Sequence, residues 1–171
     1  MKIADLLLQD FDIEMVSTRR LLERIPEDNA EYKPHEKSFA IGKLAMHVAT
    51  LPHFGKVILT TPAMDMKDPK QGFPDTTFHT RDILLGTFNS AANECRAALA
   101  ALSDEQLQEP WKFSFGELVI ANTSRSQSYR MFFFNHLLHH RGQLTVYLRL
   151  NDIPVPGLYG PSADEPFNPG K

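Results

Sequence analysis

The sequence predicts an all-α fold in which four long helices form a bundle within one domain, residues 1–171. In four separate segments, apolar residues recur at spacings of three and four, which is the period of an amphipathic helix. Strand-like alternation is weak and brief. The length, with 42% hydrophobic and 23% charged residues, is typical of one soluble domain with its own core. Such helices bury their apolar stripes against one another, so a bundle is expected.

The first two helices are predicted over residues 3–24 and from Ser38 to just before Pro62. Pro26 ends the first, because proline cannot continue a helix. Ser38 is a candidate N-cap for the second. The two apolar stripes consist of Ile3, Leu7, Phe11, Leu21, Leu22 and Ile25, and of Ala40, Leu44, His47, Leu51, Phe54 and Ile58.

A connection without helical periodicity, residues 60–79, contains three prolines and separates the second helix from the third. A loop this long in a compact domain is typically functional or mobile. The third helix is predicted from the N-cap Thr80 to Leu102. Ser103 and Gln106 then form a capping-box pattern, which predicts a short helical turn.

The fourth helix is predicted to begin between Thr123 and Ser126 and to end at Leu150. Before it, residues 109–119 (EPWKFSFGELV) alternate briefly, which is a weak indication of extended structure. After it, residues 151–171 are too rich in proline and glycine for regular structure. The fourth apolar stripe reads Tyr129, Phe133, His136, His140, Leu144 and Tyr147.

The charge pattern and the cysteine content exclude several classes of protein. The net charge is −3 without a basic cluster, so nucleic acid is not an expected partner. The single cysteine, Cys95, cannot form an internal disulfide and is typical of a reducing compartment. Acidic residues interrupt the N-terminal apolar residues, so neither a signal peptide nor a membrane span is predicted there. We therefore expect a cytoplasmic protein without a membrane partner.

Three histidines occupy core-facing positions, where titratable rings are unusual. His136 and His140 are four residues apart, on one helical face and about 6 Å apart along the axis. His47 lies in the stripe of another helix. Three inward imidazoles suit an open site for Zn, Ni, Cu or Fe, with a further position for water or substrate. Alternatively, they are hydrogen-bonded core residues, although buried ring nitrogens would then need polar partners.

The other histidines are weaker candidates as metal ligands. His139 competes with His140 for the pairing with His136, but its stripe is more polar, so we expect it at the bundle edge. His35 and His79 lie in predicted loops and His53 lies off the stripe of His47, so these three are expected to face solvent.

Residues 136–165, HLLHHRGQLTVYLRLNDIPVPGLYGPSADE, resemble the C-terminal signature of the DinB/YfiT-like family. Residues 41–52 are similar to its earlier histidine segment, and residues 11–28 to its opening helix. The H-x-x-x-H-R-G-Q core is the most specific part. The resemblance implies an up-down-down-up four-helix bundle, a homodimer, and a divalent nickel or zinc ion held by three histidines. By position, these ligands are His47, His136 and His140.

The neighbours of the second motif histidine also match the family pattern. We expect Gly142 to permit a close helix approach, and Arg141 and Gln143 to contact helix ends or the C-terminal segment. Tyr159, within the matching tail, is expected to pack over a helix end. A place at the mouth of a pocket is the alternative for the tail.

Relatives of this fold include mycothiol-dependent maleylpyruvate isomerase and transferases that use bacillithiol, which suggests chemistry by analogy. The first hypothesis is a metal-dependent enzyme that binds a low-molecular-weight thiol for S-transfer or thiol-assisted isomerisation of a small-molecule substrate. Phe54, Tyr129 and Phe133 are candidate pocket residues, with plain core packing as the alternative. Cys95 lies in an apolar stripe and is not the expected thiol. The catalytic side chains are not identifiable from the sequence.

Two other functions use the same ligands. A metal-dependent hydrolase would need a general base, but no glutamate neighbours a histidine as in H-E-x-x-H. Glu94, Glu117 or Asp10 could serve only if the fold brought one of them close. A non-enzymatic metal-binding or stress-related protein would instead close the coordination shell with a fourth protein ligand.

Overall fold

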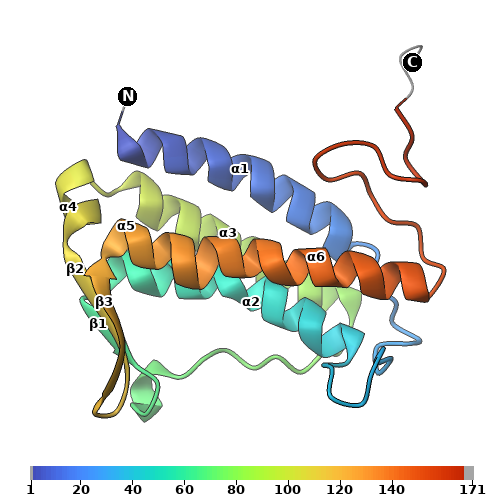
Figure 1. Ribbon diagram of the computed structural model, residues 1–171, viewed down its shortest axis with the longest axis horizontal. Helices are drawn as coiled ribbons and strands as arrows, with labels where there is room; N and C mark the ends of the chain where they lie inside the picture. Colours follow the sequence, from blue (N-terminus) through green and yellow to red (C-terminus); the bar gives the residue numbers. More distant parts are fainter. Residues whose placement is uncertain (1, 168–171) are drawn as a thin grey trace.

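Four long helices form the framework of the computed structural model, which describes residues 2–167 (Figure 1). The fourth is composite, because a π-helical segment joins a short helix to a long one. Its bounds agree with the sequence prediction to within two residues at both ends. The helices are α1 (Ile3–Leu22), α2 (Ile41–Thr60), α3 (Arg81–Ala100), and then α5 (Arg125–Ser128), the π-helical segment Tyr129–Phe134 and α6 (Asn135–Leu150).

The chain directions follow the order up-down-down-up. Figure 1 shows α1 and α6 running one way and α2 and α3 running the other. Since α2 and α3 are parallel, the chain between them must return along the bundle. A helix of 20 residues is about 30 Å long. The long connection before Thr80 is therefore a crossover along the bundle, and its length is required by the topology.

Side-chain caps begin three of the α-helices, and two of these caps, at Thr80 and Ser103, were predicted. The Thr80 hydroxyl accepts a hydrogen bond from the Ile83 N–H at the start of α3. Ser103 and Gln106 form the capping box of α4, a short helix over Asp104–Gln108. Ser124 caps α5. Each cap satisfies a backbone donor that has no partner within its helix.

The start of α2 differs from the prediction that Ser38 caps it. The helix begins at Ile41 instead, and its N-cap position, Ala40, makes no side-chain cap hydrogen bond. The Ile41 and Gly42 N–H groups donate to the backbone oxygens of Tyr32 and Ala30 in the preceding loop. Because the folded loop satisfies these donors, a capping side chain is not needed there.

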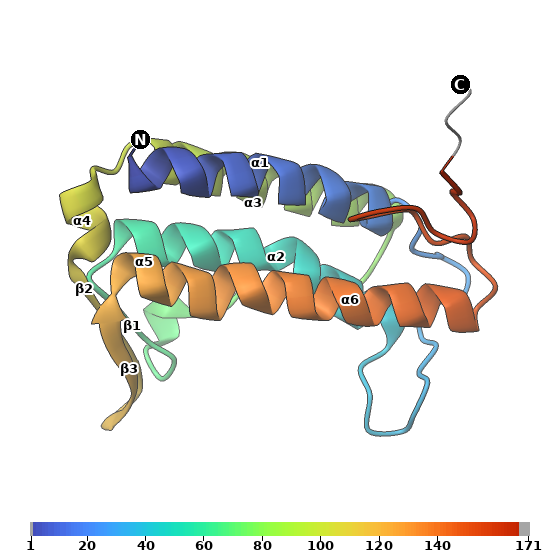
Figure 2. The same ribbon diagram turned by 45° about the horizontal axis from the view of Figure 1, so that its top comes forward.

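A three-stranded sheet at one end of the bundle corrects the all-α prediction (Figure 2). β1 (Ala63–Asp65) pairs in parallel with β2 (Pro110–Phe115), which pairs antiparallel with β3 (Leu118–Ser124). The brief alternation in the sequence is β2, whose Trp111 is fully buried. β1 has only three residues, which is too short for an alternating pattern to be recognised in the sequence. Its partner, β2, lies far along the chain.

Two buried arginines fix the last helix against its neighbours. Arg125 donates to the backbone oxygens of Ile58 and Thr61 at the C-terminal end of α2, at 2.6 and 2.7 Å. These carbonyls have no acceptor role left within the helix, and a cation there also complements the helix dipole. Arg141, 1% exposed, forms an ion pair with the buried Glu14 on α1.

The C-terminal segment folds back across the end of α1, as Figure 1 shows. Arg20 on α1 forms an ion pair with Glu165, and Arg149 on α6 forms one with Asp164. The Tyr159 hydroxyl donates to the Glu14 carboxylate and accepts from Arg141. The expectation that the tail covers a helix end agrees with these contacts. The last four residues of that predicted irregular segment, 168–171, lie outside the described part of the chain.

The glycine of the H-R-G-Q motif does not mediate a close helix approach, contrary to expectation. A Cβ atom added at Gly142 would meet no atom within 4 Å, because the position is exposed. The close contact lies at Gly55 on α2, where a Cβ atom would lie 2.8 Å from the sulfur of Cys95 and from the ring of Phe133. Sequence alone does not show which helical glycine faces a neighbour.

These two glycines should respond in opposite ways to alanine. Gly55→Ala is expected to lower the free energy of unfolding by about 1–3 kcal/mol, because the core must shift to admit the methyl group. Gly142→Ala is expected to raise it by about 0.5–1 kcal/mol, because alanine favours an exposed helix. Urea unfolding of the metal-free proteins measures both changes, and an equal effect at the two sites would contradict the packing.

No helix among residues 2–167 combines the length and the apolar character that crossing a membrane requires.

Candidate metal centre

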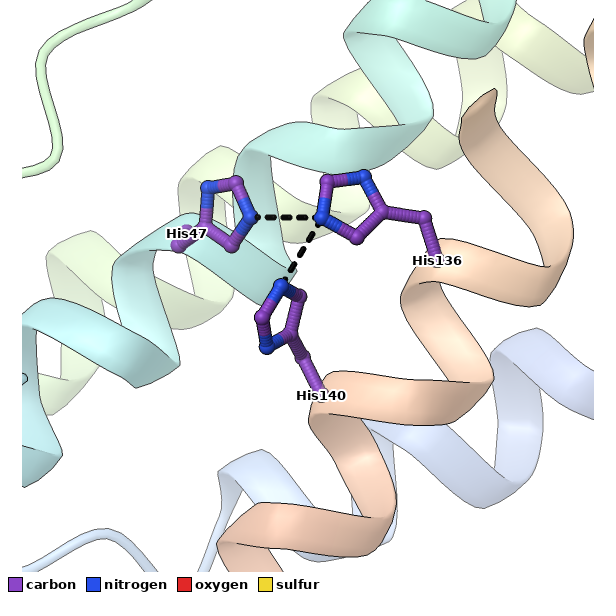
Figure 3. A group of neighbouring side chains, drawn as sticks. All are labelled: His47, His136 and His140. Carbon is purple, nitrogen blue, oxygen red and sulfur yellow. Dashed lines mark hydrogen bonds between the residues drawn. The ribbon is translucent and has the colours of Figure 1, made fainter. Parts of the chain in front are cut away.

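Three imidazoles converge between α2 and α6 (Figure 3). The Nε2 atom of His136 lies 3.3 Å from Nε2 of His47 and 2.8 Å from Nε2 of His140. One ligand atom from each ring lies within 4.8 Å of the others. Nitrogens that share a tetrahedral zinc ion are about 3.3 Å apart. The fold thus brings together the three histidines that the sequence singled out, in an arrangement compatible with metal binding.

The contacts of the Nδ1 atoms of His136 and His140 indicate which nitrogen of each ring carries the proton. Nδ1 of His136 lies 3.2 Å from the Phe132 backbone oxygen, and Nδ1 of His140 lies 2.7 Å from Oε1 of Gln143. Carbonyl oxygens only accept, so we assign the protons to Nδ1 and the lone pairs to Nε2. The Nε2 lone pairs then face each other across a distance that only a cation between them makes favourable. The donor set therefore fits a divalent ion.

Burial keeps the three rings in the neutral form that binds metal. Desolvation, with the nearby rings of His140 and His136, lowers the pKa of His47 to about 4. Desolvation also lowers the pKa of His136 and of His140, although the Phe132 and Gln143 oxygens oppose it. Neutral imidazole is the ligand form, and at neutral pH protons compete little for these nitrogens.

The register of the two ligand helices has structural causes beyond the apolar stripes. Arg125 ties the beginning of the last helix to the end of α2, as described above. The π-helical segment Tyr129–Phe134 directly precedes the ligands. Its wider turn places Phe133 and Phe134 in the core and leaves Phe132 beside His136. Neither feature was predicted from the sequence, although three consecutive phenylalanines are an unusual pattern for one helical face.

Gln143 orients a ligand, a role that the sequence did not assign to it. Gln143→Leu removes the acceptor of the His140 Nδ1 proton and should weaken zinc binding by about ten- to a hundredfold. Gln143→Glu keeps an acceptor and should retain the affinity of the parent protein. Competition against a chromophoric chelator measures both dissociation constants. Equal losses in the two variants would show that the amide acts in another way.

An apolar cavity of about 410 Å³ adjoins the centre on the side of His47 and His136. Its wall comes from α2, from the crossover segment, from β2 and from the π-helical segment. The other lining residues are Thr50, Leu51, Phe54, Met66, Phe73, Pro74, Thr76, Phe113 and Phe132. A concave, mostly apolar space beside convergent polar groups is the usual form of a small-molecule site.

A second cavity, of about 280 Å³, adjoins the centre on the side of His140. Its lining is mixed: the polar side chains of Lys37, Ser38, His140, Gln143 and Tyr147 lie there together with Phe39 and Leu44. The two cavities share no lining residue, and each includes at least one of the three histidines. The centre is therefore approached from two sides with different chemical character.

Of the three aromatic residues predicted to line a pocket, one lies at the apolar cavity and two lie in the core. Phe54 does line the apolar cavity. Tyr129 and Phe133 do not, because both are fully buried in the core, where their rings pack edge-to-face at 5.0 Å. Phe113 on β2 and Phe132, next to Phe133, line the cavity as well. An α-helical stripe cannot indicate them, since one is on a strand and the other on a π turn.

The remaining histidines and the cysteine lie outside the three-histidine group. His139 is exposed at the bundle edge, and His35 and His79 are exposed in loops, as expected. His53 is partly buried, not fully solvent-facing. Cys95 is fully buried and burial raises the pKa of its thiol, which is unfavourable for a nucleophile.

A family model described as the DinB family matches residues 1–168 of the chain. The chain belongs to the DinB family. The prediction from the H-x-x-x-H-R-G-Q motif and its flanking segments is thus confirmed.

Relatives and solved structures agree with this membership. The chain is 27% identical to the uncharacterized protein YrdA of Bacillus subtilis over 162 residues, which is 94% of this chain and 90% of YrdA. It is 30% identical to the uncharacterized protein YjoA of Bacillus subtilis over 135 residues, or 77% and 80% of the two chains. The crystal structure of the DinB-like YjoA superposes with a TM-score of 0.68 at 23% identity, covering 90% of this chain and 97% of YjoA.

A second solved DinB-like protein, from Bacillus cereus ATCC 10987, superposes with a TM-score of 0.64 at 22% identity. The superposition covers 89% of this chain and 95% of the other. At these identities, the structural likeness establishes the DinB-like fold.

Proposed function

We propose that this DinB-family protein is a metal-dependent enzyme that transfers a low-molecular-weight thiol to a small apolar electrophile. His47, His136 and His140 would hold the ion, zinc or nickel. The observation that carries the proposal is the position of the three histidines between two cavities of different character. A reaction between two dissimilar small molecules needs such an arrangement, because the reacting atoms must meet at one point.

A divalent ion at this centre would supply Lewis acidity, which lowers the pKa of a bound thiol. The protein's own residues then account for positioning. Lys37, Ser38 and Gln143 offer charge and hydrogen bonds to a polar thiol, whereas the aromatic lining of the other cavity excludes water from the electrophile. In the transfer, the sulfur forms a bond to carbon as the carbon–leaving group bond breaks. The leaving group departs with the electron pair, and the thiol proton passes to solvent.

The residues that line the two cavities favour thiol transfer over hydrolysis. A hydrolase with a general base needs a carboxylate or a comparable group close to the attacking water. Glu94, Glu117 and Asp10 line neither of the two cavities next to the histidines. Glu94 instead forms an ion pair with Lys56, 2.6 Å away, and Asp10 pairs with Arg130. A thiol bound to a divalent ion would be deprotonated outright, whereas a bound water keeps a pKa of about 7, so the thiol has less need of such a base.

The test is thioether formation from L-cysteine and 1-chloro-2,4-dinitrobenzene with zinc-loaded, nickel-loaded and chelator-treated protein. The metal-loaded protein should exceed the uncatalysed rate, and chelation should abolish the excess. Lys37→Met should raise KM for cysteine a few-fold and leave KM for cysteamine, which has no carboxylate, unchanged. Consumption of the electrophile without thiol would favour hydrolysis, and stoichiometric metal without either reaction would favour a metal-binding protein that is not an enzyme.

A further inference from the structure

We infer that the apolar cavity takes an uncharged aromatic group, and that Phe73 on the crossover segment is one of the rings that bind it. The inference rests on the proposed function for its role in catalysis, since the group would belong to the electrophile. The binding preference itself follows from the lining of the cavity and is measurable without metal.

The lining is a set of phenylalanine rings around a shared space. Phe54 lies at the centre, with the ring of Phe73 at 5.4 Å and that of Phe113 at 5.6 Å. Phe132 closes the set at 5.2 Å from Phe113. These separations and tilts are the edge-to-face and tilted arrangements that aromatic rings prefer. A ligand ring can join such a set through the same contacts, and a cavity of about 410 Å³ suits one ring with small substituents.

The cavity offers little to a charged group. Among the described residues that line it there is no lysine, arginine, aspartate or glutamate. The Thr50 hydroxyl already donates to the His47 backbone oxygen within α2, at 3.0 Å. Thr76 is the other hydroxyl in the lining and can serve one polar, uncharged substituent. In the metal-free protein, a carboxylate buried here would lose its hydration without an ionic partner, which is costly.

The outer wall of the cavity belongs to the crossover segment and not to the bundle. Met66, Phe73, Pro74 and Thr76 all come from the connection between α2 and α3. Phe73 is 49% exposed and reaches inward to Phe54, so it contributes a ring to the cavity with little part in the core. A residue so placed can change ligand preference without a large change in stability.

The only tryptophan of the chain reports on this cavity. Trp111 is fully buried and its ring stacks on Phe113 at 5.7 Å. It also lies 6.2 Å from the ring of Phe54 and 6.4 Å from that of Phe132. A nitroaromatic ligand in the cavity would therefore come close to Trp111 and quench its fluorescence.

The experiment compares nitrobenzene with 4-nitrobenzoate, which has the same chromophore and a carboxylate in addition. Trp111 fluorescence is titrated at neutral pH in chelator-treated and zinc-loaded protein, with N-acetyltryptophanamide as the correction for non-specific quenching. In the chelator-treated protein, nitrobenzene should quench saturably, and the carboxylate should weaken binding by about tenfold or more. Phe73→Ala should weaken nitrobenzene binding by about three- to tenfold. Phe115→Ala, which removes a phenylalanine of similar exposure that lines neither cavity, should have no effect.

Equal affinity for the two compounds in the metal-free protein, or equal effects of the two phenylalanine variants, would overturn the inference. These outcomes are independent of the proposed function. If nitrobenzene binds as expected but no thioether forms with metal, the proposed reaction fails and the cavity assignment stands. If thioether forms but the binding preference is absent, the cavity assignment fails and the proposed reaction stands.

Discussion

Replacing His47 with alanine is expected to abolish high-affinity zinc binding, which in the parent protein should reach about one ion per chain. His47 is the ligand that α2 contributes, so its loss leaves two imidazoles on one helix and separates the second helix from the ion. At free zinc a thousand times its dissociation constant, binding should stabilise the parent fold by about 4 kcal/mol. For a chain of this size, this corresponds to a Tm increase of about 10 °C.

Elemental analysis after gel filtration and thermal unfolding with and without chelator measure these effects. In His47→Ala the two melting curves should coincide. His139→Ala is the matched control, because it removes an exposed imidazole from the same helix as two of the ligands. His139→Ala should keep the zinc stoichiometry of the parent protein and its increase in Tm on zinc binding. Full zinc content in His47→Ala, or a lost shift in His139→Ala, would contradict the three-histidine centre.

Replacing Arg141 with methionine is expected to lower the free energy of unfolding by about 3–5 kcal/mol. Arg141 is 1% exposed and Glu14, its ionic partner on α1, is 8% exposed. Arg141 also donates to the Glu14 backbone oxygen and to the Thr18 hydroxyl, both at 3.1 Å. The substitution would leave a buried carboxylate without its cation and would remove the main polar link between α1 and α6.

Two further variants separate the ion pair from the packing around it. The double variant Arg141→Met with Glu14→Leu removes both charges and should recover most of the lost stability, because no unpaired charge remains. Tyr159→Phe removes only the hydroxyl that bridges Arg141 and Glu14, and it should lower the free energy of unfolding by about 0.5–1.5 kcal/mol. Urea unfolding of the metal-free proteins gives all three values. A double variant no more stable than Arg141→Met would mean that side-chain volume, and not charge, dominates at this position.

Local patterns in the sequence were sufficient for the four long helices, apart from the start of α2 and the π-helical segment. Stripes of period 3.6 and the side chains Thr80 and Ser103 gave their positions, since hydrophobic periodicity and capping act over a few residues. The same local geometry placed His136 and His140 on one face. Membership of the DinB family was also legible in the sequence, because the H-x-x-x-H-R-G-Q motif is contiguous.

Other features depend on segments that meet only in three dimensions. β1 has no signal of its own because its partner, β2, lies far along the chain. The apolar cavity includes Phe113 and Phe132, and not the predicted Tyr129 and Phe133, because a strand and a π turn decide which rings face it. Glu14, the ionic partner of Arg141, likewise lies on a distant segment, α1.

The sequence by itself determined the helices, the motif histidines and the family. Only the tertiary structure decided that His47 joins His136 and His140 in one group of ligand atoms, that Gln143 orients one of the rings, and which side chains surround them. The physical reason is the range of the interactions. Helix formation is governed by neighbours a few residues apart, whereas a site between helices is fixed by the packing and the buried polar contacts that join them.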